Sequence, residues 1–106
     1  MIARVWHGAV SAARADEYLA YLRRTGLRDY RQTAGHRGVH VLRRIDGGEA
    51  HFVLVSLWES MDAVRVFAGD DPETARYYPE DEGYLLELEP HVAHYEVVYG
   101  TESAAP

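Results

Sequence analysis

The chain has 106 residues, of which 17 are acidic and 11 are basic, and its net charge is -6 when the histidines are neutral. This length suits one domain, since domains of about 100 to 150 residues are the commonest. The arginines are interspersed with acids, which argues against a nucleic-acid partner because phosphate binding relies on clustered cationic charge. The absence of cysteine excludes disulfides, thiolate catalysis and cysteine-ligated metal sites.

The beginning of the chain predicts a strand followed by a long helix. Residues 2–8 alternate between two faces with the period of a strand, which places Arg4 and Trp6 on the same face. From Arg14, apolar residues recur every three or four positions as far as Leu22, with acids early and arginines late, as the helix dipole favours. The first strand therefore leads into an amphipathic helix.

The next stretch predicts a hairpin. The segment after Gly26 keeps a compatible apolar spacing, so it is either a kinked continuation of the helix or a short second helix that ends at Gly35. Residues 39–44 alternate as a strand, and Asp46-Gly47 predicts a tight turn because such turns need positive φ. The third strand then places four residues on one face: Phe52, Leu54, Ser56 and Trp58.

The last part of the chain predicts two helical segments and a closing strand. Ser60 suits the N-cap of a helix that Gly69 ends. Asp71-Pro72-Glu73 predicts a further helix, because it combines a capping acid, a proline at the first position and a second acid. Residues 80–90 are left unassigned, and 92–99 alternate as the final strand.

This order of elements is β-α-β-β-α-β, which predicts a ferredoxin-like α+β fold: an antiparallel sheet with both helices on one face. The opposite face carries Val5, Val53, Val55 and Val97, which are too apolar to remain in contact with water. The same face of a second copy would cover these valines. We therefore expect a homodimer in the form of a dimeric α+β barrel.

The face that looks toward the helices is a candidate ligand site. A lining of large aromatic groups with few polar ones suits a flat apolar ligand, so we expect a small aromatic molecule as partner. The candidate substrate-binding residues are Trp6, Phe52, Leu54, Ser56, Tyr77 and Tyr78, and the candidate catalytic residues are Trp58 and His94. We expect His94 to remove or relay a proton from a phenolic substrate. The alternative is a plain aromatic core in which His94 is only structural.

The six histidines do not predict a metal site. His91 and His94 are three positions apart on a predicted strand and therefore face opposite sides. His36 and His40 share a face but lie about 13 Å apart along it, whereas histidine ligands sit at about 2 Å from an ion. The other two histidines are isolated in sequence, so we expect no metal.

No apolar run is long enough for a signal peptide or for a membrane-spanning helix, which needs about 18 consecutive apolar residues. We therefore expect a cytoplasmic protein without a membrane partner. We assign residues 1–100 to the domain and 101–106, TESAAP, to a flexible C-terminal tail, because that segment is small, polar and ends in proline.

Four stretches of the sequence resemble the antibiotic biosynthesis monooxygenase (ABM) domains of the dimeric α+β barrel superfamily. These stretches are the ADEYLAYL helix, the FVLVSLWES strand end, the AGDD turn and the YYPEDEGYLLELEPHVAHYEV ending. The resemblance extends over residues 2–99 and implies a ferredoxin-like monomer that pairs through its sheet.

The resemblance also implies an activity. The best-known ABM enzymes oxygenate aromatic polyketide intermediates without flavin, haem or metal, so it implies a monooxygenase that needs no cofactor. Trp58 matches a tryptophan of their site, whereas Leu54 stands where they use an asparagine. Haem-degrading relatives need a histidine on the helix that follows, and Met61 to Gly69 contain none. Two alternatives stay open on the same scaffold: a non-catalytic ligand-binding or accessory protein, and an isomerase or cyclase.

Overall fold

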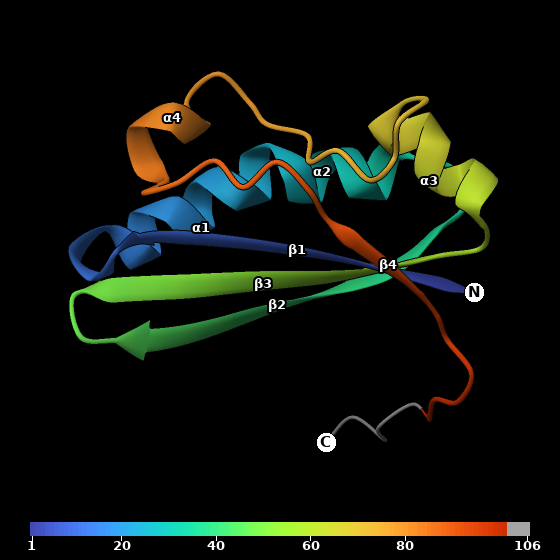
Figure 1. The fold of residues 1–106 in the computed structure, drawn as a ribbon, viewed down its shortest axis with the longest axis horizontal. Helices are drawn as coiled ribbons and strands as arrows, with labels where there is room; N and C mark the ends of the chain where they lie inside the picture. Colours follow the sequence, from blue (N-terminus) through green and yellow to red (C-terminus); the bar gives the residue numbers. More distant parts are fainter. Residues whose placement is uncertain (102–106) are drawn as a thin grey trace.

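In the computed structural model, which describes residues 1–101, a four-stranded sheet lies beneath a layer of helices (Figure 1). The strands are β1 (Ile2–Ser11), β2 (His36–Asp46), β3 (Glu49–Trp58) and β4 (Ala93–Glu96). All pairings are antiparallel and the strand order is β2-β3-β1-β4. The predicted α+β class, with an antiparallel sheet and helices on one face, is confirmed.

The helical layer is built from short elements. They are a 3-10 turn η1 (Ala12–Arg14), α1 (Ala15–Arg24), α2 (Gly26–Gln32), α3 (Met61–Ala68) and α4 (Asp81–Tyr84). The predicted caps of α3 are confirmed, since the Ser60 side chain accepts a hydrogen bond from the Ala63 amide and Gly69 has a φ of 90°. Of the two interpretations of Gly26, the separate second helix is correct. No helix within residues 1–101 is long and apolar enough to cross a membrane.

The segment between α3 and α4 corrects one prediction. The helix expected from Asp71-Pro72-Glu73 is absent: Thr74 forms an isolated β-bridge with His91, the Ala75 amide donates to Pro90 O at 2.9 Å, and the Val92 amide donates to Glu73 O at 2.8 Å. These long-range bonds satisfy backbone groups that a helix would have paired locally. The segment therefore runs extended above the sheet.

The closing strand is also shorter than expected. Strand β4 covers Ala93–Glu96 rather than 92–99, because only Ile2 to Val5 of β1 pair with it. Thr101 is the last described residue, so most of the predicted tail, 102–106, lies outside the described residues.

The period-two patterns of β1 and β3 decide which side chains enter the layer between the sheet and the helices. Arg4 and Trp6 are buried, with 2% and 8% of their surface exposed. The four residues of β3 predicted to share a face are all buried: Phe52, Leu54, Ser56 and Trp58. Trp6 lies directly opposite Leu54 in the register of β1 and β3. The assignment of this face to the core is confirmed.

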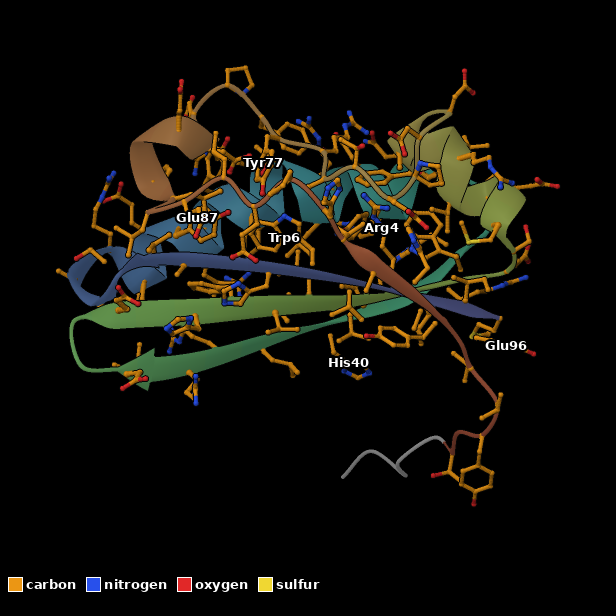
Figure 2. The ribbon with its side chains drawn as sticks, viewed as in Figure 1. Arg4, Trp6, His40, Tyr77, Glu87 and Glu96 are labelled. Atoms are coloured by element: carbon orange, nitrogen blue, oxygen red, sulfur yellow. The ribbon has the colours of Figure 1, made fainter. Side chains whose placement is uncertain are left out.

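No described helix covers the opposite face of the sheet (Figure 1). Val53 and Val55 of β3 are only partly buried there, and Leu42 and Tyr95 are more than half exposed. In Figure 2, His40 lies on this uncovered side, away from Arg4 and Trp6. The sheet thus has one face packed under helices and one face on which apolar side chains are in contact with solvent.

The indole of Trp6 lies close to the backbone at Gly8. A Cβ added to Gly8 would stand 2.4 Å from Cη2 of Trp6 and 2.8 Å from a methyl carbon of Leu85. We expect Gly8→Ala to displace the indole and to lower the free energy of unfolding by about 1–3 kcal/mol, as overpacking does. Urea unfolding measures the loss. Gly48→Ala is the matched control, because a Cβ there meets nothing within 4 Å, and equal loss in both variants would contradict the prediction.

Candidate functional site

A narrow cleft lies between the inner face of the sheet and the helical layer. Its wall is formed by Arg4, Trp6, Tyr18, Leu22, Thr25, Gly26, Tyr30, Leu54, Phe67, Arg76, Tyr78 and Asp81. The space between these atoms amounts to about 420 Å³ including the open mouth, but the part that admits the centre of a water molecule is only about 30 Å³. That is room for very few waters, so a larger ligand must widen the cleft.

Three of the predicted substrate-binding residues line this cleft: Trp6, Leu54 and Tyr78. Figure 2 shows Trp6 directed from β1 toward the helical layer, with Tyr77 above it. The Tyr77 ring packs edge-on against the indole, with 6.5 Å between ring centroids, and its hydroxyl donates to Glu89 O. Tyr77 therefore supports Trp6 without belonging to the wall.

The other predicted residues of β3 lie behind the wall, in the core. Trp58 is fully buried, and its Nε1–H donates to Ser56 Oγ at 2.9 Å. The Trp58 ring packs against Tyr30 and Phe67, at centroid distances of 5.7 and 5.6 Å, and both of these residues line the cleft. Phe52 packs in the same way behind Tyr18, at 5.2 Å. Trp58, Ser56 and Phe52 thus hold the lining residues in place.

His94 also lies outside the wall, and one of its nitrogens is occupied. Nη1 of Arg4 donates to His94 Nε2 at 3.0 Å, which requires a lone pair on that nitrogen and so a proton on Nδ1 of the neutral ring. Burial and then the charge of Arg4 lower the pKa of His94. The predicted base therefore contacts the cleft through Arg4.

Arg4 is the first candidate functional residue that the sequence analysis did not identify. Nη1 donates to Pro72 O as well as to His94, and the guanidinium carbon lies 5.8 Å from the ring centroid of Phe67. A signal was present, because the alternation of the first strand already placed this charged residue on the inward face beside Trp6. A buried cation in a cleft is a candidate for binding a negative group.

Asp81 is the second candidate functional residue that the sequence analysis did not identify. It is 4% exposed and is the only carboxylate among the described residues that line the cleft. Oδ1 accepts from the Tyr18 hydroxyl at 3.3 Å, and Oδ2 accepts from the Tyr78 amide at 2.6 Å. Burial raises the pKa of Asp81, which makes it a candidate general base. Its neighbours Glu80 and Glu82 are exposed, so nothing in this acidic run distinguished it.

Asp29 ties the extended segment to α2 beside the cleft. Its Oδ2 accepts from the Tyr78 hydroxyl at 2.5 Å and pairs with Nη2 of Arg76 at 3.3 Å. The Arg76 guanidinium lies 4.8 Å from the Phe67 ring centroid, on the same ring that faces Arg4. Within residues 1–101, no three His, Asp or Glu side chains converge to hold a metal ion.

The pKa of His94 predicts a pH dependence of stability. Because its folded pKa lies below the ordinary 6.5, the unfolded chain binds the proton more tightly, so stability falls as the pH drops below that value. His94→Gln keeps an acceptor for Arg4 but takes up no proton. We therefore expect the variant to lose less stability than the wild type between about pH 7 and about pH 5.

Urea unfolding at each pH measures this difference. His36, whose pKa burial also lowers, contributes equally to both proteins. His91→Gln is the control, since His91 is exposed and should keep the wild-type slope. If the free energy of unfolding of His94→Gln fell with pH as steeply as that of the wild type, protonation of His94 beside Arg4 would not account for the pH dependence.

Comparison with solved structures places this geometry among known folds. A candidate antibiotic biosynthesis monooxygenase from Bacillus cereus matches with a TM-score of 0.65 and 16% identity, over 96% of this chain and 97% of that one. A candidate from Nitrosomonas europaea matches with a TM-score of 0.65 and 14% identity, over 93% and 100%. The haem degrader MhuD from Mycobacterium tuberculosis matches with a TM-score of 0.56 and 21% identity, over 96% and 100%. No family model and no curated protein matches the sequence.

The MhuD structure holds two haems in its active site, but the cleft described above does not fit a haem. Histidine, cysteine, methionine and tyrosine are the usual axial ligands of haem iron. None of the first three lines the described cleft. Of its three tyrosines, Tyr18 and Tyr78 have their hydroxyls engaged by Asp81 and Asp29, and Tyr30 is 5% exposed within the core, where the open space of about 30 Å³ admits no haem. What this chain shares with these proteins is the backbone arrangement over nearly its whole length: it has the ABM fold.

Proposed function

We propose that the cleft binds a small aromatic or polyketide-like molecule and that the protein oxygenates it with O₂, without a bound cofactor, in the manner of ABM enzymes. The observation that carries this proposal is the cleft itself, in which aromatic walls enclose a buried cation and a buried carboxylate. Trp6 and Phe67 offer ring surfaces for a flat molecule. The shared ABM fold supports the same reading.

The reaction class follows from the need for electrons. In an anthrone-type substrate, removal of a proton from the reacting CH₂ gives an electron-rich anion that can react with O₂. One oxygen atom becomes the new carbonyl oxygen and the other leaves as water, so CH₂ and O₂ become C=O and H₂O. All four electrons come from the substrate carbon, and no external reductant is needed.

We assign the proton removal to Asp81 in place of His94. Asp81 lines the cleft, and burial raises its pKa, which makes it a stronger base than an exposed aspartate. His94 Nε2 already accepts a hydrogen bond from Arg4, and the ring does not line the cleft. In this proposal His94 positions Arg4, while Trp58 supports the wall through Tyr30 and Phe67.

A non-catalytic ligand-binding or accessory protein is the second candidate, and Leu54 favours it. Leu54 lies in the wall and is 3% exposed, but it offers only methyl groups at the position where the sequence resemblance implies an asparagine. A substrate oxygen there would find no hydrogen-bond partner on this residue. An isomerase or cyclase would use Asp81 in the same way but would consume no oxygen.

We also propose that a second copy of the chain covers the uncovered sheet face. Leu42 and Tyr95 are 52% and 59% exposed there, and the partly buried Val53 and Val55 lie on the central strand β3. Exposed apolar side chains of this kind favour pairing over contact with water. The two sheets would then form the dimeric α+β barrel.

Oxygen uptake tests the enzymatic proposal. With hydroxylated anthrones, we expect the pure protein to consume O₂ and to yield the matching quinone. We expect Asp81→Asn to slow turnover by about 100-fold or more, as loss of a general base does, while Glu82→Gln, an exposed neighbour, should remain active. Binding without O₂ consumption would indicate the accessory protein, and an isomeric product without O₂ consumption would indicate the isomerase.

Sedimentation velocity tests the dimer. We expect the wild type to sediment as a dimer and Val55→Glu to sediment as a monomer, because a carboxylate at the centre of the covered face would lose its water without gaining a partner. Val66→Glu is the matched control, since Val66 is 72% exposed on α3, away from the sheet. A monomeric wild type would overturn this proposal and leave the cleft unaffected.

A further inference from the structure

Arg4 is a buried cation without a counter-charge. It is 2% exposed, and no carboxylate of the described residues lies within 4.0 Å of its guanidinium nitrogens. Its two hydrogen-bond acceptors, Pro72 O and His94 Nε2, are both neutral. Charged side chains are almost never fully buried unless they are paired, because removing an ion from water costs on the order of several kcal/mol in hydration free energy. The protein alone therefore leaves the charge of Arg4 uncompensated.

The free part of the guanidinium has a definite shape. Both protein acceptors bind Nη1, which leaves the edge formed by Nε and Nη2 without a protein partner in the described part of the chain. Within residues 1–101, the fully enclosed side-chain atoms that lack a partner are Tyr21 Oη and His36 Nε2, and no nitrogen of Arg4 is among them. Since Arg4 lines the cleft, its free edge is accessible from that side.

The surroundings do not neutralise this edge. Arg76 lies on the same Phe67 ring as Arg4, and its own charge is already paired with Asp29. Asp81, the carboxylate of the wall, accepts from Tyr18 and from the Tyr78 amide instead. A negative group at Arg4 would thus meet an unpaired positive charge.

Resting on the proposed ligand site, we propose that Arg4 determines the specificity of the cleft and that the ligand is a planar aromatic carboxylate. The two N–H groups on the Nε/Nη2 edge form a fork that matches the two oxygens of a carboxylate. Trp6 is two residues along the same strand, about 6.6 Å away by strand geometry, so the ligand ring packs against the indole while its carboxylate binds Arg4. His94 and Pro72 O hold Nη1 and so orient the fork.

Calorimetric titration with 2-naphthoate and with its neutral analogue 2-naphthamide tests the proposal. We expect the wild type to bind the carboxylate roughly 10- to 100-fold more tightly than the amide. Arg4→Met should remove this preference by weakening naphthoate alone. Arg4→Lys should retain part of it, since an ammonium keeps the charge but not the fork. Arg31→Met is the matched control, because Arg31 is exposed on α2 and should leave both affinities unchanged.

The outcomes separate this inference from the proposed function. Equal affinity of the wild type for the two probes, or loss of the preference in Arg76→Met but not in Arg4→Met, would overturn the role of Arg4 and leave an aromatic site. Failure of both probes to bind the wild type would overturn the aromatic site itself. If Arg4→Met does not fold, the ratio of the affinities for 2-naphthoate and 2-naphthamide is compared between the wild type and Arg4→Lys. A purely structural arginine gives no preference for the carboxylate in either protein.

Discussion

Burial of the Arg4 guanidinium is the constraint on which the cleft depends. A charge removed from water must keep hydrogen-bond partners, and here Pro72, in the turn between α3 and α4, and His94 of β4 supply them. Arg4 itself comes from β1, which is central in the sheet between β3 and β4. One side chain therefore joins three segments that are far apart in sequence, and it does so at the wall of the cleft.

The same aromatic side chains serve packing and the site. Trp58 and Phe52 fill the layer from behind, and the rings that they support, such as Tyr30 and Tyr18, form the wall. This dense packing explains why little open space remains between the rings. The segment beside the cleft is held at Asp29 by polar contacts from Tyr78 and Arg76, while Ala75, Tyr77 and Tyr78 also pack against the core.

On the uncovered sheet face, the tertiary structure brings together side chains that are far apart in the sequence. His7 and His51 appear isolated in sequence, yet β1 and β3 bring their rings to a centroid distance of 5.3 Å, with Nε2 of His7 3.1 Å from Nδ1 of His51. Glu89 lies 2.5 Å from the other nitrogen of His7, and Glu49 lies 3.3 Å from the other nitrogen of His51. Diagonal neighbours on two paired strands are close in space. Which residues become neighbours depends on the register of the strands, and no pattern of adjacent residues indicates that register.

The sequence by itself determined the elements whose signals are local: the alternation that buries Arg4 and Trp6, the turn at Asp46-Gly47, the caps of α3 and the α+β class. Such signals depend on a few neighbouring residues and on backbone geometry. Only the tertiary structure decided that Pro72 lies in a turn before an extended segment, that Asp81 is the buried acid of an acidic run, and that His94 binds Arg4. Each of these depends on contacts between residues far apart in the chain, where burial and long-range hydrogen bonds outweigh local propensity.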